Sequence, residues 1–127
     1  MKYLVDIDWV IDALANIPAA ITPLRQLAHD GIAVSMISFG ELYDGAYGSR
    51  VPLTEIARIQ QFLSSYPVIN LSDAIMDRFA QTRTLLRSQG MLIPNMDILI
   101  ALAHNLTLLT RNVRHFQRIP GLARYQP

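Results

Sequence analysis

Apolar residues along the chain alternate between short continuous runs and longer segments with helical spacing. Four short runs are typical of buried strands, at residues 3–5, 32–36, 67–70 and 106–110. Between these runs, apolar residues recur at the three- to four-residue spacing of amphipathic helices. Strands separated by helices form a parallel sheet that is covered on both faces. The pattern therefore predicts an α/β fold, a three-layer α/β/α sandwich with a central parallel sheet.

The predicted helices have recognisable ends. They are expected over residues 9–14, 18 to about 29, 38 to about 47, 53–63, 72 to about 90, and 94 to about 102. Ser38 stands three residues before Glu41, the spacing of a capping box, and so predicts that the third helix begins there. Pro94 is expected in the first turn of the last helix, and Gly90 is expected to cap the end of the helix before it.

Length and composition favour one domain over residues 1–127. With 127 residues, of which 51% are hydrophobic, the chain can bury a sizeable core. The absence of cysteine excludes disulfides and thiolate chemistry and suits a reducing compartment. No apolar run reaches the roughly 18 residues of a membrane span, and the first residues do not resemble a secretory signal. We therefore expect a cytoplasmic protein without a membrane partner.

Charge is distributed unevenly along the chain. The formal net charge is only +1, too small to indicate a strongly basic nucleic-acid binder. However, the segment after Asp97 contains no carboxylate and four arginines, which are Arg111, Arg114, Arg118 and Arg124. Guanidinium groups match phosphate geometry, so Arg111 and Arg114 are candidate contacts to a polyanion. A solvated, exposed face would explain the same residues.

Four oxygen-bearing side chains fall near junctions of predicted strands and helices. They are Asp6, Glu41, Asp97 and Asn112. Because parallel strands place their carboxyl ends along one edge of the sheet, these side chains are expected to lie together. Carboxylate and amide oxygens suit a hard divalent cation such as Mg²⁺. The four positions together predict a metal-dependent enzyme that acts on phosphodiesters.

Each position also has a purely structural explanation. Asp6 or the nearby Asp8 could cap the first helix, and Glu41 could complete the capping box with Ser38. Asp97 could serve the helix dipole in the first turn of its helix, and Asn112 could simply turn the chain. One metal site is the more economical explanation, since it explains all four positions at once.

The same residues resemble the PIN-domain family, and within it the VapC-like toxin ribonucleases of toxin–antitoxin pairs. The matching segments span essentially the whole chain, at residues 3–6, 38–46, 92–101, 106–112, 116 and 119–122. The resemblance implies an α/β/α sandwich whose acidic cluster binds Mg²⁺ or Mn²⁺ and cleaves RNA. It assigns Asp6, Glu41 and Asp97 to the family's three core acids and Asn112 to a more variable fourth position. It further implies homodimers, an inhibiting antitoxin, and products with a 5′-phosphate and a 3′-hydroxyl.

Two features depart from the family pattern. The first acid is commonly followed by Thr and then Asn or Ser, whereas this chain has Ile7 and Asp8, so a hydroxyl is missing beside Asp6. Asp97 and Asn112 are separated by 15 residues, a shorter interval than the resemblance leads us to expect. The helix after Asp97 should therefore be short, and Asn112 is the least secure of the four assignments.

The metal and the partner surfaces follow from these assignments. A cation held by Asp6 and Asp97, with Glu41 binding directly or through water, would lower the pKa of a bound water and neutralise phosphate charge. The apolar helix 53–63, with Tyr43, Tyr47 and Phe62, is a candidate surface for a second copy or an antitoxin. Burial in the core would explain the same residues.

Other functions compete with this interpretation. Asp6-Ile7-Asp8 after an apolar strand also fits a haloacid-dehalogenase-like phosphatase, in which the first Asp is the nucleophile. That class needs a basic residue later in the chain, usually lysine, as does a receiver domain, and the only lysine here is Lys2. A catalytically weak or inactive PIN domain that binds RNA or an antitoxin is the remaining alternative.

Overall fold

Four parallel strands form the centre of the protein in the order β3–β2–β1–β4. The structure, a computed structural model, describes residues 1–91, 96–111 and 121–125. The strands are β1 at Tyr3–Val5, β2 at Ile32–Ser35, β3 at Val68–Ile69 and β4 at Thr107–Leu109. The helices are α1 at Ile7–Leu14, α2 at Pro18–Leu27 with the short 3₁₀ turn Ala28–Asp30, α3 at Met36–Tyr47, α4 at Pro52–Leu63, α5 at Asp73–Ser88 and α6 at Met96–His104.

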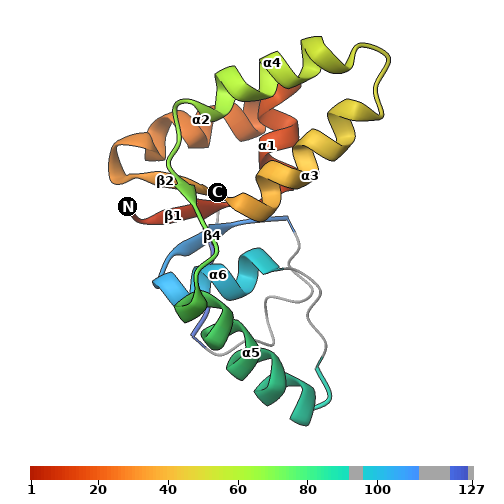
Figure 1. Cartoon of the computed structure of the whole chain (residues 1–127). Helices are drawn as coiled ribbons and strands as arrows, with labels where there is room; N and C mark the ends of the chain where they lie inside the picture. Colours follow the sequence, from red (N-terminus) through yellow and green to blue (C-terminus); the bar gives the residue numbers. More distant parts are fainter. Residues whose placement is uncertain (92–95, 112–120, 126–127) are drawn as a thin grey trace.

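Helices cover both faces of this sheet, which confirms the three-layer α/β/α prediction (Figure 1). Successive strand residues point to opposite faces, so each strand feeds two cores. Val5, Val34 and Leu109 join the core beneath α1 to α4. Leu4, Ala33 and Leu108, which pair in register, join the core beneath α5 and α6. The near-continuous apolar runs of the sequence are thus strands that are buried on both sides.

Strand order places a topological switch between β1 and β4. The chain proceeds outward from β1 to β2 and β3, and then returns to the other side of β1 as β4. In open α/β sheets, ligands bind outside the carboxyl ends of the strands at such a switch. Asp6 directly follows β1 and Thr110 directly follows β4, so these two residues stand at the switch point.

The start of α3 corrects one sequence prediction. Ser35, not Ser38, is the N-cap, because the Ser35 hydroxyl accepts a hydrogen bond from the Ser38 backbone N–H at 3.2 Å. β2 consequently ends one residue before the predicted boundary, and Met36 is a 42% exposed helix residue rather than a buried strand residue. The predicted capping box from Ser38 to Glu41 is therefore wrong, and Glu41 lies beyond the first turn of α3.

Most other helix ends agree closely with the prediction, but α1 begins at Ile7, two residues earlier than predicted, so that Asp8 lies in the helix and not in the turn before it. Ser72 caps α5 by accepting from the backbone N–H of Ile75 at 3.2 Å. The C-cap of α5 is Gln89, one residue before Gly90, which follows it with a φ of 76°. Pro94, the predicted first turn of α6, lies outside the described residues, and α6 is described from Met96 onward.

Residues near the C-terminus extend the sheet beyond β4. The backbone N–H of Leu108 donates to Ala123 and its carbonyl accepts from Tyr125, at 2.9 and 3.0 Å. The ring of Tyr125 packs edge-on against Tyr3 and Trp9. These contacts cover the edge of β4, which an exposed strand would otherwise leave open to pairing with another chain.

The helices of the described ranges are too short or too polar to span a membrane singly. No single helix there is long and apolar enough to cross one. Helices 7–14 and 18–30 together have the length and apolar composition of a membrane span, but the two are bent by 110° relative to each other.

Candidate active site

Asp6 stands at the switch point and is 4% exposed. As N-cap of α1 it accepts a hydrogen bond from the Ile7 backbone N–H at 2.8 Å through Oδ1. Its other carboxylate oxygen, Oδ2, accepts from the hydroxyl of Thr110 at 2.7 Å. The capping role considered for Asp6 is therefore real, yet it occupies one oxygen and leaves the second oriented by Thr110 at the end of β4. Thr110 thus places a hydroxyl beside Asp6, although the residue that follows Asp6 in sequence has none.

Asp97 lies in the first turn of α6 and is 3% exposed. Two hydroxyls donate to it, Ser35 to Oδ1 at 2.5 Å and Ser38 to Oδ2 at 2.8 Å. Both serines are buried, one at the end of β2 and the other in the first turn of α3. The side chain of Asp97 is thus fixed at both oxygens by residues about 60 positions earlier in the chain.

The surroundings of Asp97 disfavour its ionised form. Burial raises the pKa of Asp97 to about 7, and the neighbouring Asp6 acts in the same direction through its charge and a side-chain hydrogen bond. The hydroxyls of Ser35 and Ser38 act in the opposite direction, because they donate to the carboxylate. Asp6 and Asp97, which are 91 residues apart in sequence, are therefore neighbours in the folded protein.

Glu41 faces the same pair from α3. Its side chain is exposed, and partial burial followed by the charge of Asp6 raises its pKa. The charge of Asp6 thus acts on Glu41 and on Asp97 alike. The structure brings together the three acids that the sequence singles out, with Asp6 as their common neighbour.

Arg111 has acidic neighbours of its own. Its Nη1 lies 3.0 Å from Asp12 Oδ2, and its Nε lies 3.9 Å from Asp8 Oδ2. Its side chain is nevertheless 59% exposed, so donors of this guanidinium still face solvent. Asn112 and Arg114, the remaining predicted site residues, lie outside the described residues.

Three hydroxyl residues of the site are not among the residues predicted from sequence. Ser35, Ser38 and Thr110 are all at most 5% exposed, and each donates to a site carboxylate. A weak signal exists for two of them, since Thr110 is the last residue of one predicted apolar strand and Ser35 is the last but one of another. The third, Ser38, stands out in the sequence only as a predicted helix cap.

A divalent cation fits the donors at this place. Mg²⁺ is usually held by one or two carboxylates and keeps several waters. Asp6 and Asp97 provide two buried carboxyls, and a cation would relieve the repulsion between them that contributes to the raised pKa of Asp97. Within the described ranges, no group of three or more His, Asp or Glu side chains is placed to hold one metal ion. The donors thus suit a hydrated cation rather than a closed protein cage.

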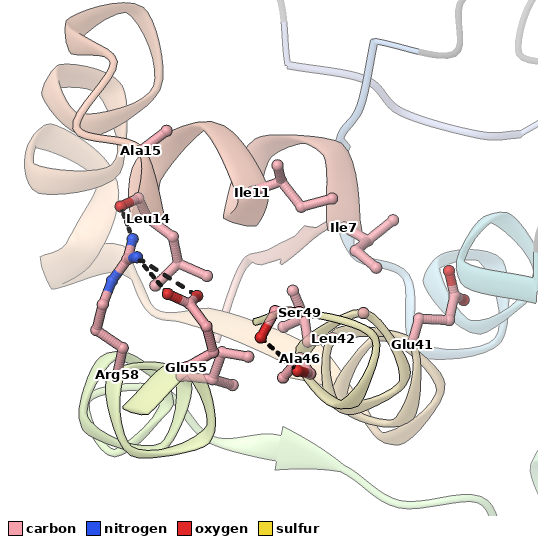
Figure 2. Close-up of a pocket in the computed structure, with 12 residues that line it drawn as sticks. Ile7, Ile11, Leu14, Ala15, Glu41, Leu42, Ala46, Ser49, Glu55 and Arg58 are labelled. Carbon is pink, nitrogen blue, oxygen red and sulfur yellow. Dashed lines mark hydrogen bonds and ion pairs between the residues drawn. The ribbon is translucent and has the colours of Figure 1, made fainter. Parts of the chain in front are cut away.

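An apolar groove of about 260 Å³ begins beside Glu41 and runs between α1, α3 and α4. Figure 2 shows Glu41 at one end and Arg58 with Glu55 at the other, while Ile7, Ile11 and Leu14 of α1 lie along it. Arg58 donates to Glu55 at 3.3 Å and to the backbone carbonyl of Leu14, which closes the far end. Ile11 is 50% exposed there, so the groove presents apolar surface to solvent next to the acidic site.

Known proteins with similar sequences are ribonucleases. No protein-family model matches the chain. The chain is 33% identical to ribonuclease VapC2 of Rickettsia felis over 127 residues, which cover 96% of this chain and 95% of that protein. It is 29% identical to the tRNA(fMet)-specific endonuclease VapC of Shigella flexneri, with the same coverage of both chains.

Solved structures agree with this similarity. VapBC2 from Rickettsia felis, bound to a DNA fragment from its promoter, matches with a TM-score of 0.88 at 31% identity and covers 98% of both chains. DNA-bound VapBC from Salmonella typhimurium matches with a TM-score of 0.88 at 27% identity, over 98% of this chain and 97% of that chain.

Proposed function

The chain belongs to the VapC ribonuclease family, and from that premise we propose that it is a divalent-metal-dependent endoribonuclease, the toxin of a toxin–antitoxin pair. The observation that carries the proposal is the placement of two buried carboxyls, Asp6 and Asp97, at the switch point of the sheet, each oriented by hydroxyl donors. Relatives over nearly the full length of the chain lend no support to a haloacid-dehalogenase-like phosphatase. An RNA substrate and a chain without cysteine suit the cytoplasm that the sequence predicts.

We assign metal binding to Asp6 and Asp97 directly and to Glu41 through a bound water, with Asn112 as an additional ligand, and the ion to Mg²⁺ or Mn²⁺. When bound, such a cation activates water and stabilises charge on a phosphate. Asp6 and Asp97 would supply the buried negative charge that holds it, and the mostly solvent-facing Glu41 would complete the acidic face toward the substrate. As the family resemblance implies, in-line attack would leave a 5′-phosphate and a 3′-hydroxyl.

The hydroxyl residues contribute by orientation. Ser35 and Ser38 fix both oxygens of Asp97, and Thr110 fixes Oδ2 of Asp6. Hydrogen bonds of this kind hold metal-binding carboxylates in place and commonly affect metal affinity or activity about 10–100-fold. These three residues are therefore part of the proposed catalytic centre, although none of them is an acid.

RNA is the proposed substrate, and Arg111 and Arg114 are its proposed phosphate contacts. Support comes from the exposed guanidinium of Arg111 beside the site, which retains donors after its contacts with Asp8 and Asp12. The name of the Shigella flexneri relative makes initiator tRNA the first substrate to test. Oligonucleotides of random sequence provide the comparison that shows whether cleavage is selective.

An antitoxin is the proposed macromolecular partner, and the apolar groove between α1, α3 and α4 is its proposed docking site. An inhibitor seated there would reach the acidic site, because Glu41 lines the groove. Ile11→Glu should weaken capture of a co-expressed cognate antitoxin, since it places a charge in apolar surface. Ile17→Glu is the matched control, because Ile17 is similarly exposed, at 41%, and does not line the groove. Equal capture by both variants would reject this docking site.

A homodimer is the proposed assembly. Of the residues nominated from sequence, Tyr43 and Phe62 are partly buried against the core. Tyr47 and Leu53 are 65% and 81% exposed and flank the turn between α3 and α4 together with Val51, which is 54% exposed. Exposed apolar side chains so close in sequence favour burial against a second copy. Sedimentation that shows a monomer at micromolar concentration would contradict it.

RNA cleavage measured with and without a divalent cation tests the enzymatic proposal. The purified protein should cut RNA in Mg²⁺ or Mn²⁺ and stop in excess EDTA. A protein that binds antitoxin but cleaves no RNA in either ion would instead be the inactive binding module considered from sequence.

A further inference from the structure

Asp8 is joined to the residue that follows Thr110. The backbone N–H of Arg111 donates to Asp8 Oδ2 at 2.9 Å, and Nη2 of Arg111 donates to the backbone carbonyl of Asp8 at 3.4 Å. Nη1 of the same guanidinium pairs with Asp12, one turn further along α1, at 3.0 Å. Both the backbone and the side chain of Arg111 are thereby attached to α1.

We propose that Asp8 is a positioning residue, whose carboxylate holds the end of β4 against α1 so that the hydroxyl of Thr110 stays on Asp6. The effect of Asp8 on catalysis rests on the proposed ribonuclease function. The role of Asp8 in holding β4 against α1 does not depend on that function.

Three consecutive contacts connect the end of β4 to the start of α1. The backbone N–H of Asp6 donates to the carbonyl of Leu109 at 2.8 Å, and the hydroxyl of Thr110 donates to Asp6 at 2.7 Å. The backbone N–H of Arg111 then donates to Asp8. The pairing of β4 with β1 ends at Leu109, so the strand ladder no longer fixes the two residues beyond it. The side chains of Asp6 and Asp8 take over that task.

The hydrogen bond from Arg111 explains a departure from the family pattern. Asp8 adds a carboxylate two residues from Asp6, where it would be expected to increase repulsion within the acidic site. Its Oδ2 accepts a hydrogen bond from Arg111, which opposes that repulsion, and its side chain is only 24% exposed. A role as an additional metal ligand and a role as the helix-dipole acid of α1 are the two competing explanations, and each predicts a different response to substitution.

Four variants separate these roles. Asp8→Ala removes the acceptor, whereas Asp8→Asn keeps a carbonyl oxygen at the same reach but loses the charge. Thr110→Val removes the hydroxyl with little change of shape. Asp73→Ala is the matched control, because Asp73 is an exposed acid in the first turn of α5 and so reports the loss of a helix-dipole interaction alone. Should Asp8→Ala fail to fold, Asp8→Ser replaces it, since the shorter side chain also loses reach.

The first readout is amide hydrogen exchange of the Arg111 N–H in metal-free protein, followed by NMR. Loss of a hydrogen bond to a charged acceptor should speed exchange about tenfold or more in Asp8→Ala. Asp8→Asn should retain most of the protection, and Asp73→Ala should retain all of it. Unchanged exchange in Asp8→Ala overturns the proposal whether or not the protein cleaves RNA.

The second readout is steady-state cleavage of RNA. Asp8→Ala and Thr110→Val should each lower kcat about tenfold with KM within about twofold, since both act on the geometry of Asp6. The double variant should lose no more than either single variant, because the two residues act through one chain of hydrogen bonds. Asp8→Asn should recover most of the wild-type kcat.

Failure of the proposed ribonuclease function can be distinguished from failure of the positioning role of Asp8. If the wild-type protein cleaves no RNA, the proposed function fails while the exchange experiment still decides the positioning role. If Asp8→Asn loses activity and Mn²⁺ affinity as severely as Asp97→Ala, Asp8 is a metal ligand and the positioning proposal is overturned. Additive losses in the double variant overturn it as well.

Discussion

Two acidic pairs lie at the carboxyl edge of the sheet, and they have different kinds of neighbours. Asp6 and Asp97 accept hydrogen bonds from the hydroxyls of Thr110, Ser35 and Ser38. Asp8 and Asp12, on the adjacent face of α1, lie against the guanidinium of Arg111. Hydroxyls orient a carboxylate without cancelling its charge, whereas a guanidinium does both.

The two acidic pairs also differ in how their surroundings shift the pKa of a carboxyl. Burial and Asp6 together raise the pKa of Asp97 to about 7. Burial also raises the pKa of Asp8, but the backbone N–H and the guanidinium of Arg111 both act against that rise. The comparison fits the two proposals, in which the first pair would receive a cation and the second would hold two chain segments together.

The largest effect is expected from loss of a site acid. Asp6→Ala, Glu41→Ala or Asp97→Ala should each reduce RNA cleavage more than about 100-fold, which exceeds the usual effect of residues that only orient a metal ligand. Circular dichroism and thermal melting should show a folded protein, since repulsion between carboxylates is relieved. Wild-type cleavage by Asp97→Ala would remove the basis for the proposed site.

The next effect concerns the pH dependence of stability in metal-free protein. The pKa of Asp97 is about 7 in the folded state and an ordinary 3.8 in the unfolded chain. Between pH 3.8 and about 7 the folded protein therefore binds more protons than the unfolded chain does. Its contribution to the free energy of unfolding is therefore complete below about pH 4 and is lost as pH rises to about 7, by up to roughly 4 kcal/mol. Urea titrations of wild type and Asp97→Asn across this range measure the difference. Parallel curves would contradict the raised pKa.

The serines should produce a smaller effect. Ser35→Ala and Ser38→Ala each remove a donor that lowers the pKa of Asp97, so the pKa should rise further. Cleavage should fall about 10–100-fold, and the pH at which Mn²⁺ binding is half-complete should shift upward. Calorimetric titrations with Mn²⁺ at several pH values test both. An unchanged midpoint would mean that these hydroxyls do not tune the acid.

Loss of the arginines should have the smallest effect on the rate of RNA cleavage. Replacing both Arg111 and Arg114 with Ala should weaken RNA binding and lower the salt slope by about 0.7 for each phosphate that is no longer neutralised. Mn²⁺ affinity should fall much less than it does in the acid variants, because a guanidinium cannot ligate a cation. Unaltered RNA affinity of this double variant across a salt titration would place the substrate path elsewhere.

Asn112→Ala should weaken metal binding less than any acid variant, since a neutral amide binds a cation less strongly than a carboxylate.

Much of the fold could be predicted because local pattern and tertiary structure agree. All four strands and the covering helices follow from apolar spacing, and Asp6 and Asp97 are recognisable because they stand at element junctions. The error at α3 arises where two local explanations compete. Met36 continues an apolar run and so resembles a strand residue, although it is an exposed helix residue. Ser35 is consequently hidden inside the predicted strand.

Contacts between distant residues could not be predicted in this way. Arg111 is identified by a local excess of positive charge, but its neighbours Asp8 and Asp12 precede it by about 100 residues. The parallel pairing of β1 with β4 brings them together. The donors to Asp97 are similarly distant, because Ser35 and Ser38 come from β2 and α3.

The most direct test of the cation site measures Mn²⁺ occupancy and RNA cleavage in one titration of the wild type and Asp97→Asn. In the wild type, cleavage should rise in step with bound Mn²⁺ and disappear when EDTA removes the ion. Asp97→Asn should neither bind Mn²⁺ at these concentrations nor cleave RNA, while its thermal unfolding shows an intact fold. Cleavage that persists in EDTA, or wild-type Mn²⁺ binding by Asp97→Asn, would contradict the proposed cation site.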